Sequence, residues 1–138
     1  MSFVLKIAAA SLIVVPALSS AQVSISEVRI VPDVSLAPDA RRACFERVNV
    51  LNDRRSMLDE EKLFIDRENE SIASAGDRLA AELRSLNSSD VGAVEAYNAR
   101  SDEHNRRVAA QNRRVAQLNS RVASFNGEAA DATRFCQR

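Results

Sequence analysis

The sequence predicts an all-α fold, a long antiparallel two-helix coiled-coil hairpin with an extended N-terminal arm. Three observations predict it. Apolar residues recur at every seventh position through most of the chain, a turn-forming cluster interrupts this repeat once, and two cysteines flank that cluster at equal distances. With 138 residues the chain has room for one domain, and its single Tyr, five Phe and no Trp suit long helices better than a thick globular core.

Residues 1–21 have the layout of a secretory signal peptide. Lys6 precedes a largely apolar run over 7–15, and the small residues Ser19 and Ala21 occupy the −3 and −1 positions of a cleavage site. The run is shorter than the roughly 20 residues that span a bilayer, so we expect no stable membrane insertion after cleavage. A buried N-terminal helix and a retained anchor are the alternatives. Cleavage would make the protein periplasmic or secreted.

The next segment, 22–38, differs in composition from everything that follows. Valine and isoleucine alternate in part, and Pro32 and Pro38 interrupt the pattern. We expect an extended arm, with one short strand as the alternative. Pro38 followed by Asp39 is typical of a helix start, because proline is tolerated in the first turn and a carboxylate complements the positive helix terminus.

The first helix is predicted over 39–87. This stretch holds no proline and one glycine, and its repeat has seven consecutive apolar positions. These positions are Cys44, Leu51, Leu58, Ile65, Ile72, Leu79 and Leu86.

Turn-forming and capping residues follow, so the turn is predicted at 88–90 and Ser89 or Asp90 should cap the next helix. The second helix is predicted over 91–136. It carries its own seven-residue repeat, and asparagine recurs on one flank of it. These residues are Asn98, Asn105, Asn112, Asn119 and Asn126. They favour a solvated flank that hydrogen-bonds across the helix pair, and a binding ladder is the alternative.

The two cysteines, Cys44 and Cys136, predict the register of the hairpin. If facing residue numbers sum to 180, these two meet, and the main apolar positions of one helix face apolar or small residues of the other. An exported protein meets an oxidising compartment, so an intramolecular disulfide is the first expectation. An intermolecular disulfide and a redox pair are the alternatives.

Charged flanks support the same register. Four pairs of opposite charge should face each other across the helices, and two asparagines should face aspartates on the other flank. The pairs are Arg121–Glu61, Arg114–Glu68, Arg100–Glu82, Arg54–Glu128, Asn112–Asp66 and Asn119–Asp59.

The only histidine, His104, should lie in the helix pair opposite Gly76, where it fills the space that a missing side chain leaves. A pH-sensing role is the alternative, because imidazole titrates near neutrality. A single histidine leaves no histidine-based metal cluster within one chain, and no phosphate loop, nucleophile elbow, zinc spacing or calcium loop is present. We therefore expect no catalytic site, cofactor, metal or small-molecule ligand.

One set of apolar residues falls outside the predicted seam between the helices. Val50, Met57 and Phe64 repeat every seven residues on the first helix, and Leu63 adjoins them. These four are the candidate partner-binding residues, because a heptad-spaced apolar stripe on the surface of a solitary hairpin indicates that another chain or segment packs against it. The arm, a second copy and a client protein are the three candidate covers.

The sequence carries 19 basic and 19 acidic residues, and this balance argues against nucleic acid as the main partner. The general look resembles that of small exported bacterial coiled-coil proteins, an architectural likeness that transfers no function. The first functional hypothesis is a non-catalytic structural or protein-interaction module of the bacterial cell envelope, with a protein partner or self-association. The alternative is a periplasmic chaperone or stress-type binder of unfolded proteins.

Overall fold

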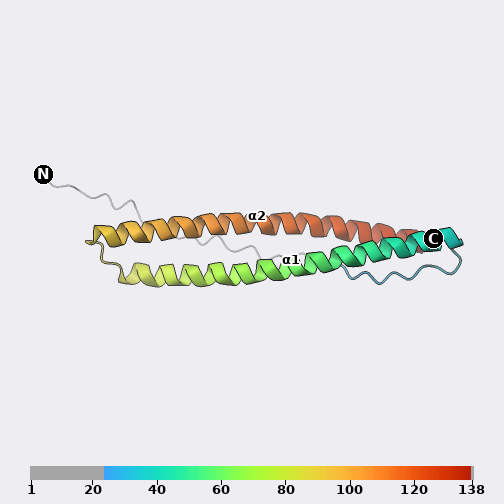
Figure 1. The fold of residues 1–138 in the computed structure, drawn as a ribbon, viewed down its shortest axis with the longest axis horizontal. Coiled ribbons are helices and arrows are strands. Elements are labelled where there is room, and N and C mark those ends of the chain that lie inside the picture. Colours follow the sequence, from blue (N-terminus) through green and yellow to red (C-terminus); the bar gives the residue numbers. More distant parts are fainter. Residues whose placement is uncertain (1–23, 138) are drawn as a thin grey trace.

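The computed structural model describes residues 24–137 and shows two long helices packed antiparallel (Figure 1). Helix α1 runs from Pro38 to Ser85 and helix α2 from Val91 to Cys136. The predicted all-α hairpin is confirmed. Helix α1 begins one residue before the predicted range and ends two residues before its predicted end at 87, whereas α2 has the predicted bounds. The predicted signal peptide, 1–21, lies outside the described residues.

A single seam of buried side chains joins the two helices. On α1 the buried positions follow the seven-residue repeat, and on α2 two interleaved repeats are buried because this helix presents two ridges to its partner. The fully buried side chains at the centre of the seam are Phe125, Ile65, Ile72, Leu118, Val108, Val115 and Val122. Such a seam is a thin core, so constraints at its ends matter for stability.

The middle of the seam contains polar side chains that are hydrogen-bonded in part. The Gln111 side-chain amide is fully buried and donates to the Ile65 carbonyl and to Asn69 Oδ1, each at 3.0 Å. The Asn69–Gln111 contact has the spacing that the register predicts, with residue numbers summing to 180. The amide therefore fixes the register at a point where apolar packing gives little preference.

The connection between the helices is built from capping hydrogen bonds. Asn87 Oδ1 accepts from the Ser89 amide at 3.0 Å and the Asn87 carbonyl accepts from the Asp90 amide at 3.0 Å. Asp90 then caps α2, because its Oδ1 accepts from the Ala93 amide at 3.0 Å. Of the two predicted cap residues, Asp90 does the capping.

The arm folds back from the start of α1 and runs beside the disulfide end of the hairpin (Figure 1). From Ser24 to Ala37 it forms no strand. Val28 is buried, and Ile25 and Ile30 are partly buried against the apolar core of the helix pair. The arm is therefore a third layer over one flank of the hairpin, extended as the sequence predicts.

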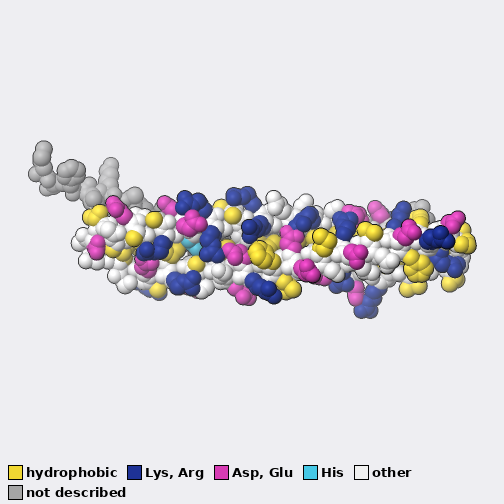
Figure 2. Space-filling model, in the orientation of Figure 1, with side chains coloured by type: hydrophobic (Ala, Val, Ile, Leu, Met, Phe, Trp, Pro, Cys, Tyr) yellow, Lys and Arg dark blue, Asp and Glu magenta, His cyan; other side chains and the backbone are white. Residues whose placement is uncertain are grey.

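Charged side chains of both signs are interspersed along the visible face of the rod (Figure 2). In the described residues neither helix contains a stretch apolar and long enough to cross a lipid bilayer.

Candidate functional site

The open end of the hairpin is locked by the Cys44–Cys136 disulfide, whose Cα atoms lie 5.5 Å apart. Both cysteines are fully buried. The Asp33 amide donates to the Cys136 carbonyl at 2.8 Å, so the arm is tied to the same point. The helix ends and the arm thus form one constrained unit at this end of the molecule.

Asn126 attaches the arm to α2. Its Oδ1 accepts from the Ser26 amide at 2.9 Å, and its Nδ2 donates to the Ser24 carbonyl at 3.0 Å. The side chain thus pairs with the arm backbone much as a neighbouring strand would. Sequence reasoning placed Asn126 on a flank with four other asparagines but did not identify it as the docking point. Its nearness to Cys136 along the second helix was the available signal.

The docked arm does not cover the apolar stripe, which consists of Val50, Met57, Leu63 and Phe64 and is called the α1 stripe below. Val50 is 57% exposed, Met57 68%, Leu63 56% and Phe64 56%. Asn126 and the heptad-spaced residues of the stripe, Val50, Met57 and Phe64, lie on opposite flanks of the helix pair in the heptad geometry. The arm is therefore not the cover of these residues.

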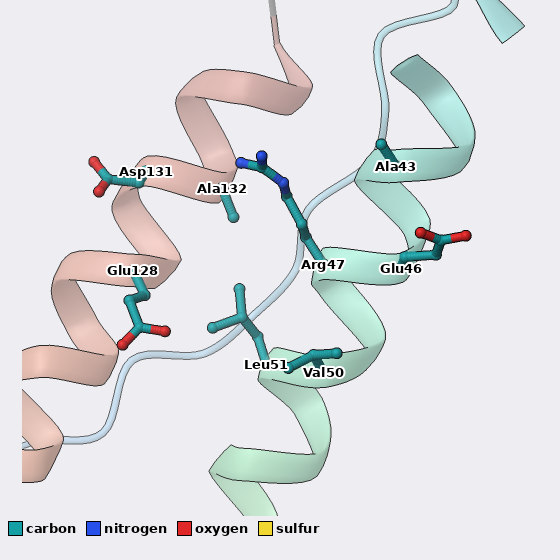
Figure 3. Close-up of a pocket in the computed structure, with 8 residues that line it drawn as sticks. All are labelled: Ala43, Glu46, Arg47, Val50, Leu51, Glu128, Asp131 and Ala132. Carbon is teal, nitrogen blue, oxygen red and sulfur yellow. The ribbon is translucent and has the colours of Figure 1, made fainter. Parts of the chain in front are cut away.

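An open groove of about 490 Å³ lies between the helices at the disulfide end, beside one end of the α1 stripe. Its floor is apolar and its rim is mostly acidic. The lining residues are Ala43, Glu46, Arg47, Val50, Leu51, Glu128, Asp131 and Ala132. Figure 3 shows the Arg47 side chain reaching toward α2 and Glu46 pointing away from it.

Two arginines stack on aromatic rings along this face. Arg47 Cζ lies 4.1 Å from the centre of the Phe135 ring, and Arg114 Cζ lies 5.8 Å from the centre of the Phe64 ring. Both contacts join α1 to α2. At these distances each cation is attracted by the face of the ring.

Two of the three acidic groups that line the groove, Glu128 and Asp131, are already paired. Arg54 forms an ion pair with Glu128, and hydrogen bonding from that guanidinium holds the pKa of Glu128 below its ordinary value. Asp131 is paired with Arg134. A carboxylate whose pKa is lowered stays ionised near neutrality, so Glu128 is a poor general acid.

Three of the four predicted charge pairs are present, Arg121–Glu61, Arg100–Glu82 and Arg54–Glu128. The fourth prediction was wrong. Glu68 accepts from Arg107 at 2.7 Å rather than from Arg114. The Arg114 side chain instead lies over the Phe64 ring, a contact that a charge-pairing rule does not consider.

The two predicted asparagine–aspartate pairs are also wrong. Asp66 accepts from Lys62 at 2.6 Å, and Asp59 lies 3.6 Å from Arg55 Nε, so each aspartate pairs one turn back on its own helix. A charged donor four residues away competes successfully with a neutral amide across the seam.

His104 is buried opposite Gly76, as the register predicts. A Cβ added at Gly76 would lie 3.3 Å from His104 Nε2, so the ring occupies the space that this glycine leaves. Neither ring nitrogen has a hydrogen-bond partner among the described residues. Burial, and secondly the positive charge of Arg107, lower the pKa of His104. The ring is therefore neutral near pH 7 and packs as part of the seam.

Within residues 24–137 no group of three or more His, Cys, Asp or Glu side chains is arranged to hold a metal ion. The candidate functional surface is thus the α1 stripe together with the groove beside it. No protein-family model, no curated protein and no solved structure matches this chain.

Proposed function

We propose that the chain is exported and acts without catalysis, as a structural or protein-interaction module of the bacterial cell envelope. The observation that carries the proposal is the exposure of Val50, Met57 and Phe64 on the side of the hairpin that the docked arm leaves open. Burial of apolar area is worth about 25 cal/mol per Å², so a partner that covers this stripe gains appreciable binding free energy.

Two further features support the proposal. The disulfide joins residues 92 positions apart and suits an oxidising compartment such as the periplasm. The layout of residues 1–21 favours export. A disulfide-locked rod with a partly apolar side presents a long, rigid binding surface, and a rigid surface loses little conformational entropy when it binds.

The export part is tested by the N-terminus of the protein recovered from an envelope fraction. Mass spectrometry should find a chain that begins at Gln22 with the disulfide formed. A chain that keeps residues 1–21 and has free thiols at Cys44 and Cys136 would contradict export.

The interaction part is tested by a photo-crosslinking residue placed at Met57, compared with one at Ala81. Both positions are exposed on α1, but Ala81 lies outside the α1 stripe. We expect one discrete adduct from Met57 and none from Ala81. Met57→Glu with Phe64→Glu should abolish the interaction and leave helicity and the disulfide intact. Equal crosslinking from both positions would contradict a binding role of the stripe.

A periplasmic chaperone remains a second candidate function, and one observation favours it. Met57 is the most exposed of the four stripe residues at 68%, and flexible methionine side chains adapt to varied apolar surfaces. A chaperone should give many heterogeneous adducts from Met57 and suppress the aggregation of unrelated unfolded proteins. A single adduct without such suppression favours the interaction module.

A further inference from the structure

We propose that the partner of the α1 stripe is a second copy of this chain, bound antiparallel with Met57 on the two-fold axis. The inference rests on the proposed function, because it names the partner of the same surface. In this arrangement α1 packs on α1 of the second copy, and Val50 of each copy meets Phe64 of the other. The assembly contains four helices, of which the two α1 helices form an isologous interface.

The shape of the surface is self-complementary. Phe64 projects from one end of the stripe and is 56% exposed, while the groove floored by Val50 and Leu51 lies at the other end. The two features are 14 residues apart on one helix, which is about 21 Å at 1.5 Å per residue. A two-fold axis through Met57, midway between them, places the ring of each copy over the groove of the other.

The charges beside these two features are also complementary. Arg114 lies over the Phe64 ring, so a positive charge lies beside the projecting aromatic side chain. The groove that receives it is rimmed by Glu46, Glu128 and Asp131 with one basic residue, Arg47, and of the three carboxylates Glu46 is the one that forms no ion pair among the described residues. The basic surroundings of the ring in one copy therefore meet the acidic rim in the other, and such complementarity favours one orientation of binding.

The flank of α1 that borders α2 has an antiparallel charge pattern. Its successive positions are Arg47, Arg54, Glu61 and Glu68. With Met57 on the axis, Arg47 of each copy faces Glu68 of the other, and Arg54 faces Glu61. All four contacts across the axis pair opposite charges, and they would add to the ion pairs that Arg54, Glu61 and Glu68 already form with α2 of their own copy.

The outer flank of α1 supplies two more opposite-charge contacts. Glu46 and Arg67 are exposed and form no ion pair among the described residues, and the same register brings Glu46 of each copy to Arg67 of the other. One contact on this flank is unfavourable, because Asp53 faces Glu60. This exception supplies a test of the register below.

Other registers are less favourable. If the axis moves by half a heptad toward the N-terminus, Asp53 faces Asp53 of the second copy and Arg54 faces Arg54 of the second copy. If it moves equally far in the other direction, Glu60 and Glu61 each face the same residue of the second copy. The second shift also leaves Val50 opposite Ser71, and the first sets Phe64 opposite the small side chain of Ala43. Like charges placed opposite each other disfavour both shifts.

A two-fold axis parallel to the rod is less favourable as well. It would lay α1 on α2 of the second copy and set Val50 and Phe64 close to Asp131 and Gln117. Only the antiparallel arrangement pairs the apolar residues with one another. The overlap along the rod is about 57 Å for 38 residues and about 10 Å wide for the one helix of each copy that makes the contact, which gives roughly 570 Å² per copy. This is below the approximately 800 Å² per partner of a standard interface, so the charged contacts beside the stripe are needed to favour one arrangement.

The decisive experiment uses two variants that cannot self-associate but can pair with each other. Glu46→Arg alone sets two arginines against each other at both ends of the interface, and Arg67→Glu alone sets two glutamates there. Each variant should weaken self-association at least about tenfold in sedimentation equilibrium. A mixture of the two variants should form heterodimers with an affinity near that of the wild-type chain, because both contacts are again of opposite sign.

The position of the axis is tested by cysteine crosslinking. Met57→Cys places the two new thiols at the axis, so mild oxidation should produce disulfide-linked dimers rapidly. Ser71→Cys is the control, because it lies on the same face of α1 but its two copies are about 42 Å apart across the axis. Asp53→Lys should tighten self-association, since the new ammonium group faces Glu60 of the other copy.

Three results would overturn the inference: a wild-type chain that stays monomeric at every concentration measured, a variant mixture that associates no better than either variant alone, or equal crosslinking from both cysteine positions. These results are distinct from failure of the proposed function. A monomeric chain that still gives one discrete adduct from Met57 with a different protein contradicts the second copy and supports the interaction module.

Discussion

The His104 ring of α2 packs against Gly76 of α1, because a Cβ added at Gly76 would lie only 3.3 Å from His104 Nε2. The only histidine of the sequence thus fills the space beside the only glycine of α1. Elsewhere in the seam, apolar side chains meet apolar or small ones, except where the Gln111 amide bonds Asn69. Here a ring replaces a missing side chain. The pair therefore offers a direct test of the register.

Alanine at Gly76 should stabilise the protein less than alanine at a glycine with free space around it. Gly127 is the matched control, because an added Cβ there meets nothing within 4 Å. We expect Gly127→Ala to raise the free energy of unfolding by about 0.5–1 kcal/mol through helix propensity. Gly76→Ala should give a smaller gain or a loss, since the His104 ring must move. Equal gains in denaturant titrations of the two variants would refute the packing contact.

Acid should destabilise the hairpin through His104. Its pKa in the folded protein lies below the ordinary 6.5, chiefly because it is buried, so the unfolded chain binds more protons in that range. The stability present above about pH 6.5 is lost as the pH falls through the lowered pKa. His104→Leu should remove this part of the pH dependence. The check is the melting temperature of both proteins between pH 7.5 and 5, and parallel curves would contradict it.

Removal of the Asn126 amide should release the arm. Asn126→Ala deletes two hydrogen bonds to the arm backbone and should cost about 1–3 kcal/mol of arm docking. Limited proteolysis and hydrogen exchange should then detect faster opening of residues 24–33. Asn105→Ala, an exposed position of the same asparagine repeat, should leave the arm protected. Similar protection in both variants would show that apolar contacts alone hold the arm.

The ion pair of Glu68 should couple to Arg107 and not to Arg114. A double-mutant cycle of Glu68→Ala with Arg107→Ala should give a coupling of about 0.2–1 kcal/mol, the range of exposed pairs. The same cycle with Arg114→Ala should give a value near zero. A larger coupling to Arg114 would restore the pairing that the sequence predicted.

Reduction of the disulfide should lower the melting temperature strongly. The bond joins residues 92 positions apart, which corresponds to about 4.5 kcal/mol in the chain-entropy model. Thermal unfolding with and without reductant measures the effect. Non-reducing electrophoresis and peptide mapping should find the Cys44–Cys136 link within one chain. A chain dimer held by these two cysteines would contradict the hairpin lock.

The sequence was sufficient for the helix pair because its signals repeat. The heptad positions from Cys44 onward, the turn cluster before Val91 and the spacing of the cysteines each indicate the same register. Independent signals that agree leave few alternative pairings. The disulfide, the Asn69–Gln111 contact and the Gly76–His104 contact all lie at positions whose numbers sum to 180.

The sequence was insufficient where single side chains choose between neighbours. Arg114 could reach Glu68 or the Phe64 ring, and only the folded structure shows that it lies over the ring. Asp66 likewise pairs with Lys62 on its own helix. Long side chains have several partners within reach at nearly equal free energy, so position in the heptad does not decide between them.

By itself, then, the sequence determined two helices, their direction and their register, because periodic burial and a single covalent link leave one way to superimpose the repeats. The tertiary structure decided the face that remains open. The arm has no repeat that specifies its place, and it docks through Val28 and Asn126 on the flank away from the α1 stripe. That choice depends on an apolar surface and a hydrogen-bonding amide that come together only after the helices have packed, and it leaves Met57 and Phe64 exposed.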